Sequence, residues 1–377
     1  MTATSPTGLN QTFGNFTWNC TGQTGYTSIT SNMLVNGNFS LNAGRFTLNN
    51  STSYSLTIGG NYTQTGGVFD FNRGSSGTSN VYIAKNMSIT TSNPQSIITS
   101  SGTINGNFIF NGTNQTVYIP TPGVTYWTNF TINNGSNVQL LSNITLYGTA
   151  SYLSQLSVNG TLDVSTYTIT DYSSTAGATQ FNLNAGGTLI TANTNGVNGT
   201  IPSSTTTKNL SASANYIFNG TSAQVTGTLL TNANNLTITN PAGVTLSSNV
   251  TVSGNLSILT SGTTLNCDIY QITGNATGTM TMDPGTTLTI GRSGQWDKTD
   301  FPTNFTKAHI SLDPTSTVIY YGGTRTFSSS PNYGNLVIAS TPYDQTCDAS
   351  GNLTINGTLT INANTTLRLA WSGLSLM

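Results

Sequence analysis

Apolar and polar residues alternate along most of this chain in short runs. The runs RFTLNN, YSLTIGG and GVFDF, between residues 45 and 71, show the pattern, and clusters of Asn, Gly and Ser separate them. Alternation with a period of two is typical of a strand with one buried face, and such clusters are typical of turns. No useful length of sequence has a helical period. The pattern therefore predicts an all-β chain of many short strands.

A short repeat underlies the strands. An Asn followed by a large apolar residue recurs through the first third of the chain, at Asn38-Phe39, Asn61-Tyr62, Asn86-Met87, Asn107-Phe108 and Asn129-Phe130. Such a unit cannot bury its own apolar side chains, but stacked units bury them against one another. Leucine-rich repeats need a Leu framework and helical segments, which are missing here. We predict a right-handed parallel β-helix, a β-solenoid with coils of roughly 20–25 residues.

A longer repeat overlies the short one. The sequence FIFNGTNQTV at residues 108–117 reappears as YIFNGTSAQV at 216–225 and, more loosely, as VIYYGGTRTF at 318–327. A strand that begins with Asn and a large apolar residue follows each copy. Several coils therefore form a supermodule of about 100 residues, a larger unit than the repeats of most solenoids.

This longer repeat divides the chain into four parts. They are N-terminal coils at residues 1–105, a first supermodule at 106–214, a second at 215–314 and a partial third at 315–377. The third copy stops early, so we expect the chain to be a piece of something longer. Because the short repeat runs through all four parts, we expect one continuous solenoid.

The composition suits such a stack. Charged residues make up 5% of the chain, against roughly 25% in typical soluble domains. Equivalent side chains on successive coils lie about 4.8 Å apart, where like charges repel by roughly 1 kcal/mol even in water. Ser, Thr and Asn form hydrogen-bonded ladders with their own copies instead. Polarity without charge is therefore what a repeating coil favours.

Charge and hydropathy also argue against nucleic acid and membranes as partners. The formal net charge of −1 offers no basic surface to nucleic acid or to an anionic membrane. No apolar run approaches the ~18 residues that a membrane span requires.

The three cysteines Cys20, Cys267 and Cys347 form no CxxC motif. One disulfide, between Cys267 and Cys347, and three buried thiols are equally compatible with the sequence.

The sequence gives little support for a catalytic function. Parallel β-helices also house polysaccharide lyases and glycosidases, which need paired carboxylates on neighbouring coils. The best local cluster is GQWDKTDFP at residues 294–302, and a polar loop explains it more simply. His309 is the only histidine, so no triad is available. We therefore expect a protein that is not an enzyme and that binds no cofactor or metal.

Five sequences carry a resemblance over roughly residues 105–377. They are the FNGT strand, the NLTI strand, VTLSSNVTVSGNLSI at 244–258, GTTLTI at 285–290 and the FP at 301–302. Together they resemble the repetitive β-solenoid modules of secreted prokaryotic surface proteins and adhesins. The resemblance implies an exported polypeptide that is extracellular or lies at the cell surface.

Two non-catalytic functions compete. The first is a self-assembling filament, sheath or surface-layer subunit, in which the apolar C-terminal run docks on the next copy. Its side chains are Leu367, Leu369, Trp371, Leu374 and Leu376. A hydrophobic plug that closes the core explains the run equally well. The second is an adhesin stalk or glycan-binding module, with surface aromatics that grip glycans. The candidates are Tyr126, Trp127, Trp296, Tyr320 and Tyr321.

Asn-x-Ser/Thr sequons recur through the repeat. Asn111, Asn219 and Asn275 each begin one and are candidate glycosylation sites. The alternative interpretation is structural, with Asn forming ladders at the corners and Thr forming strands.

Overall fold

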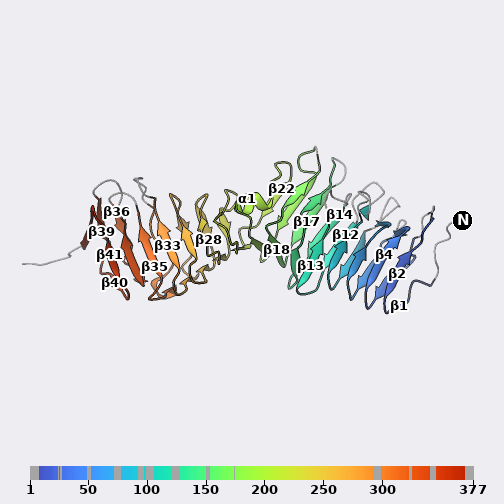
Figure 1. Cartoon of the computed structure of the whole chain (residues 1–377), viewed down its shortest axis with the longest axis horizontal. Coiled ribbons are helices and arrows are strands. Elements are labelled where there is room, and N and C mark those ends of the chain that lie inside the picture. Colours follow the sequence, from blue (N-terminus) through green and yellow to red (C-terminus); the bar gives the residue numbers. More distant parts are fainter. Residues whose placement is uncertain are drawn as a thin grey trace, which may run out of the picture. The chain divides into compact units, whose positions relative to one another are not determined.

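The computed structural model is a parallel β-solenoid of about 12 coils, with about 24 residues in each coil and almost no helix (Figure 1). The predicted fold class is confirmed. The chain divides into two compact units, unit 1 with residues 1–190 and 200–211, and unit 2 with residues 191–199 and 212–377. The structure describes residues 8–23, 25, 28–48, 52–71, 78–91, 97–98, 106–119, 128–149, 153–173, 175–292, 299–321, 325–339 and 345–369.

Unit 1 is built from two long parallel sheets and two small ones. The first long sheet has the order β1 (Thr12–Phe13), β3 (Met33–Val35), β6 (Ser55–Ile58), β9 (Ser79–Ile83), β12 (Gly106–Phe110), β14 (Thr128–Ile132), β17 (Ser154–Val158), β20 (Thr179–Leu183) and β22 (Thr207–Leu210). The second has the order β2 (Phe16–Asn19), β4 (Phe39–Ala43), β7 (Tyr62–Gln64), β10 (Met87–Ile89), β13 (Gln115–Tyr118), β15 (Asn137–Leu140), β18 (Thr161–Ser165) and β21 (Thr188–Thr191). The small sheets are β5 (Arg45–Thr47), β8 (Val68–Asp70) and β11 (Ile97–Ile98), and β16 (Ile144–Leu146) with β19 (Ile169–Asp171).

Unit 2 repeats this plan. One sheet contains β23 (Asn215–Phe218), β26 (Leu236–Ile238), β29 (Leu256–Ile258), β32 (Met280–Met282) and β34 (Ile310–Leu312). A second contains β24 (Gln224–Val225), β27 (Val244–Thr245), β30 (Thr264–Asn266), β33 (Thr287–Ile290), β35 (Thr317–Tyr320), β38 (Asn335–Ile338) and β41 (Leu359–Ile361). The small sheets are β25 (Asn232–Ala233), β28 (Val250–Val252) and β31 (Ile272–Thr273); β36 (Arg325–Phe327), β39 (Gln345–Ala349) and β42 (Thr365–Leu369); and β37 (Asn332–Tyr333) with β40 (Thr354–Ile355).

Helix is confined to two short turns in the described residues. They are α1 (Gly196–Thr200) and the 3-10 turn at Lys307–His309. No helix in this part of the chain has the length and hydropathy needed to cross a membrane.

The core is a stack of side chains that repeat from coil to coil. Phe16, Phe39 and Tyr62 stand in register on β2, β4 and β7, and their rings stack at centroid distances of 5.7 and 5.6 Å. Phe39 and Tyr62 are fully buried. Burial of each large apolar side chain contributes about 1.5–3 kcal/mol, so the apolar residue after each corner Asn provides much of the stability.

An asparagine ladder holds the corners together. The side-chain oxygen Oδ1 of Asn38 accepts a hydrogen bond from the backbone N–H of Asn61 at 2.9 Å, and Asn61 accepts in the same way from Asn86 at 3.1 Å. In unit 2, Asn235 accepts from the N–H of Asn255 at 2.9 Å. Each bond links one coil to the next and satisfies a backbone donor at a turn, where the sheet leaves it without a partner.

The five Asn-apolar pairs of the sequence do not form one repeat, which corrects our interpretation. Asn38, Asn61 and Asn86 precede strands of the second sheet, whereas Asn107 and Asn129 lie in β12 and β14 of the first. Strand β10 pairs instead with β13. Between Asn86 and Asn107 the chain therefore moves to another face of the solenoid. The sequence does not reveal this, because the number of residues between them is close to that between the other pairs.

The long repeat also changes face. In unit 2, YIFNGTSAQV begins in β23, whereas VIYYGGTRTF begins in β35, which belongs to another sheet. A copy of the repeat therefore does not return to the face on which the previous copy began. The division into supermodules stays a prediction.

Candidate functional site

Several predicted contact residues lie outside the described residues. They are Tyr126, Trp127, Trp296, Trp371, Leu374 and Leu376. Tyr320 is buried, and its hydroxyl hydrogen-bonds the hydroxyl of Tyr333 at 2.9 Å. This position therefore belongs to the core, and the expectation that it grips a glycan is wrong. Tyr321 is half-buried.

The candidate glycosylation sites differ in exposure. Asn111 and Asn219 are exposed. Asn275 is half-buried, and its Oδ1 accepts hydrogen bonds from the backbone N–H and the hydroxyl of Thr277. Glycosylation at these positions stays a prediction.

The sequons of the repeat have a structural cause. In Asn38-Phe39-Ser40 and Asn235-Leu236-Thr237, the Asn forms the corner ladder and the middle residue is fully buried. The Ser or Thr points away from the core, because successive side chains of a strand alternate between its faces. The structural interpretation of these sequons is confirmed.

Two of the described aspartates, Asp163 and Asp268, have partners of their own. Asp163 accepts a hydrogen bond from Gln139 at 3.2 Å, and Asp268 pairs with Arg292 at 3.1 Å. Asp171 lies on β19, in a different sheet from Asp163. No group of three or more His, Cys, Asp or Glu residues in this part of the chain could hold a metal ion.

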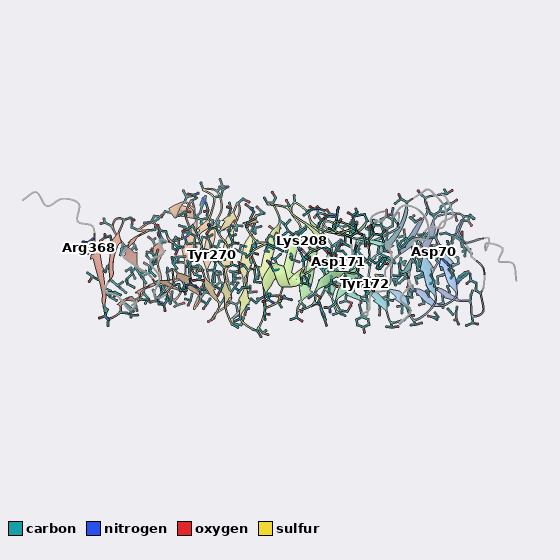
Figure 2. The ribbon with its side chains drawn as sticks, turned by 90° about the horizontal axis from the view of Figure 1, so that it is seen from above. Asp70, Asp171, Tyr172, Lys208, Tyr270 and Arg368 are labelled. Carbon is teal, nitrogen blue, oxygen red and sulfur yellow. The ribbon has the colours of Figure 1, made fainter. Side chains whose placement is uncertain are left out.

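Ion pairs in the described residues join one coil to the next. Arg368 on β42 binds both carboxylate oxygens of Asp348 on β39, at 2.7 and 2.9 Å. Partly exposed Arg45 pairs at 2.6 Å with buried Asp70, which is labelled in Figure 2. Opposite charges thus meet where like charges would repel.

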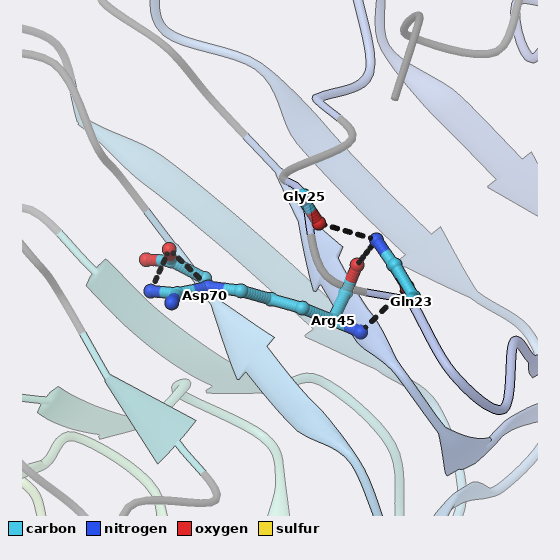
Figure 3. A network of polar contacts seen from close by, with 4 residues as sticks. All are labelled: Gln23, Gly25, Arg45 and Asp70. Carbon is cyan, nitrogen blue, oxygen red and sulfur yellow. Dashed lines mark hydrogen bonds and ion pairs between the residues drawn. The ribbon is translucent and has the colours of Figure 1, made fainter. Parts of the chain in front are cut away.

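The Arg45 pair belongs to a wider polar network. The side-chain oxygen of Gln23 accepts from the backbone N–H of Arg45 at 2.8 Å, and the Gln23 amide donates to the carbonyls of Gly25 and Arg45 (Figure 3). These bonds fix the turn before β5, so we assign the network a structural role.

Cys267 is a free thiol inside the core. The disulfide with Cys347 is therefore not formed. Burial raises the pKa of the Cys267 thiol to about 12, so it stays protonated and unreactive at neutral pH. Cys20 is free as well.

A buried glutamine follows FNGT in two copies of the long repeat, FIFNGTNQTV and YIFNGTSAQV. The side chain of Gln224 accepts a hydrogen bond from the Gly220 N–H at 2.9 Å. It donates to the carbonyls of Thr191 and Asn193 on the preceding coil. Gln115 makes the same bonds with Gly112 and with two carbonyls, those of Ile83 and Lys85. The motif is thus a corner clamp between coils.

Strand β41 is the outermost described strand of the seven-stranded sheet in unit 2. It exposes side chains at register positions that are buried on the preceding strand, β38. Leu336 and Ile338 on β38 are 0% and 1% exposed, and β41 covers them. Their register partners Leu359 and Ile361 on β41 are 40% and 46% exposed. No described strand pairs with the far edge of β41. Positions that belong to the core on β38 are therefore exposed on β41.

Unit 1 shows the same contrast at its first coil. Phe16 and Trp18 on β2 are half-buried, whereas their partners Phe39 and Leu41 on β4 are fully buried. No described strand lies beyond β2. We call the outer faces of β2 and β41 the end surfaces.

Leu367 is half-buried in β42, the outermost described strand of its own sheet, and Leu369 ends that strand. Sequence reasoning selected these residues but missed Leu359 and Ile361. The signal was present in the alternation LTI at 359–361, which matches the inward pattern of earlier strands.

Comparison of the chain with protein-family models, curated proteins and solved structures gives no significant match.

Proposed function

We propose that this chain is an extracellular structural protein, the subunit of a filament, sheath or surface layer, in which the end surface of one copy stacks on that of the next. The observation that carries the proposal is the difference between β38 and β41. The same register positions are buried under a further coil and exposed without one.

Stacking would continue the interactions that hold the coils together. It would bury Leu359 and Ile361 of one copy and Phe16 and Trp18 of the other, with each large side chain gaining up to about 1.5–3 kcal/mol. It would also pair the edge N–H and C=O groups, which otherwise form a template for association.

The extracellular location is supported by the resemblance to secreted surface modules. The surface chemistry agrees with it, because hydroxyl and amide groups rather than charges keep the chain in solution. An adhesin stalk or glycan-binding module of a larger cell-surface protein is the alternative. A polysaccharide-degrading β-helix enzyme has the weakest support, because a polar loop explains its best local cluster, at residues 294–302, more simply.

A charge on the end surface tests the proposal. We expect Ile361→Asp to prevent association, because stacking would bury an unpaired carboxylate, while the fold of the inner coils is kept. Leu34→Asp is the matched control, since Leu34 is 39% exposed on the inner strand β3 and lies on a side face.

Sedimentation velocity over a concentration series provides the readout, with circular dichroism to verify the fold. Association of the wild type and of Leu34→Asp, together with a monomeric Ile361→Asp variant, would support end-to-end stacking. Equal association by both variants would contradict it.

A further inference from the structure

A pair of stacked tyrosines stands on a side face of unit 1. Tyr147 and Tyr172 directly follow β16 and β19, which pair in register, and the Tyr172 N–H donates to the Leu146 carbonyl at 2.9 Å. The ring centroids are 5.7 Å apart and the planes differ by 19°. Tyr172 is 74% exposed, whereas no other large apolar side chain in the described residues exceeds 46%. An aromatic side chain this open is the one most available to a ligand.

A shallow depression of about 450 Å³ lies beside the rings. The polar residues that line it are Thr149, Asp171, Ser173 and Thr175. Aromatic residues and residues with hydroxyl groups thus border the same space. This combination of aromatic surface with a few polar groups is typical of small-ligand sites.

The Asp171 carboxylate is satisfied within the protein. It accepts hydrogen bonds from the hydroxyls of Thr179, at 2.9 Å, Ser203 and Thr205, and the hydroxyl of Thr206 is a fourth partner. Partial burial raises the pKa of Asp171, but these hydroxyl hydrogen bonds outweigh it and leave the pKa below its usual value. A carboxylate has about four acceptor positions, so these hydroxyls occupy them and Asp171 holds the neighbouring Ser and Thr residues in place.

We propose that this depression binds a neutral carbohydrate, with a sugar ring against Tyr172 and sugar hydroxyls on the Ser and Thr residues that line the depression. A pyranose presents apolar C–H groups on its face and hydroxyls around its rim. The exposed tyrosine ring matches the face, and groups that donate and accept match the rim. The site does not depend on whether copies of the chain assemble.

An organic cation is the main rival ligand, because it also favours an aromatic face beside a carboxylate. Two observations favour the neutral sugar. The charge of Asp171 is already shared among hydrogen bonds from four hydroxyls. In addition, the ammonium group of Lys208 donates to the carbonyl of Ser203, a residue that binds Asp171, at 2.6 Å. A positive charge already lies near the carboxylate, so a second cation is disfavoured.

The test uses the full chain at a concentration where it is monomeric. Cellohexaose, mannohexaose and chitohexaose are titrated separately and followed by saturation-transfer-difference NMR and calorimetry. We expect at least one to bind, Tyr172→Ala to weaken its binding tenfold or more, and Tyr172→Trp to retain it. Tyr118→Ala is the matched control, because Tyr118 is 38% exposed on β13 in another sheet of unit 1, and it should bind within twofold of the wild type.

Three results would overturn the proposal. The first is no binding by any of the three sugars. The second is unchanged sugar binding by both Tyr172→Ala and Tyr147→Ala. The third is binding of tetramethylammonium but of none of the sugars, with loss of that binding in Tyr172→Ala, because the depression would then be a cation site. Circular dichroism shows that each variant is folded.

Discussion

Asparagine side chains at the corners determine how one coil is joined to the next. Asn235 shows both halves of the interaction, because its backbone N–H donates to Asn215 Oδ1 at 3.2 Å and its own Oδ1 accepts from the Asn255 N–H at 2.9 Å. The side chain is uncharged, so the interaction repeats without the repulsion that a carboxylate would accumulate. The rarity of charged residues and the abundance of Asn thus have one cause.

Asn235→Ala removes the acceptor of the Asn255 N–H. We expect the free energy of unfolding to fall by about 0.5–1.5 kcal/mol, because a hydrogen bond between coils is lost while water can still reach the exposed Asn255 N–H. The measurement is urea denaturation followed by circular dichroism. Asn232→Ala is the control, since exposed Asn232 uses its side chain only to donate to neighbouring Thr231, and its effect should stay below about 0.5 kcal/mol. Equal effects of the two substitutions would contradict the ladder.

Strands and corners form one recurring element, and much of it could be predicted from the sequence. The period of two located the strands, and the Asn-apolar pairs indicated where corners precede strands. The face of each strand could not be predicted, because the step from Asn86 to Asn107 resembles a full coil but ends on another sheet. Only the hydrogen-bonded register of β10 with β13 resolves this.

Candidate sites were harder to predict than the fold. Tyr320 looked like a surface aromatic, but its place in the inward alternation of β35 buries it. Tyr147 and Tyr172 were missed, although each follows an Ile-Thr-x strand, at 144–146 and 169–171. The shared strand pattern was the available signal. That these tyrosines become neighbours depends on the coil length between them.

The glutamine clamp offers a test at the scale of the element. Gln224→Leu keeps an apolar stem but removes the acceptor of the buried Gly220 N–H and one of the donors to the carbonyls of Thr191 and Asn193. We expect a loss of at least about 2 kcal/mol in the free energy of unfolding, since several hydrogen bonds of one buried network are lost together. Thermal and urea denaturation measure it.

Val225→Ala is the control for the clamp, because Val225 follows Gln224 and is 37% exposed. This substitution should change the free energy of unfolding by less than about 0.5 kcal/mol. A Gln224→Leu variant as stable as the wild type would show that the clamp contributes nothing.

At the scale of the whole molecule, the repeated coil favours assembly in which one copy stacks on the end of another. A coil stabilises the one before it by covering its core and pairing its edge, and the apolar side chains of the end surfaces at β2 and β41 are more exposed than their register partners on β4 and β38. We therefore propose assembly as the role of the molecule, with carbohydrate binding on a side face that stacking would leave open.

The most direct test of end-to-end stacking is electron microscopy of the purified chain over a concentration series, with fibre diffraction from the same samples. We predict filaments whose diffraction shows a repeat of about 4.8 Å along the filament axis, because coils of neighbouring copies would pair as coils do within one copy. Discrete short particles at every concentration would contradict the account. Filaments with the 4.8 Å repeat perpendicular to their axis would contradict it as well, since the copies would then associate side by side.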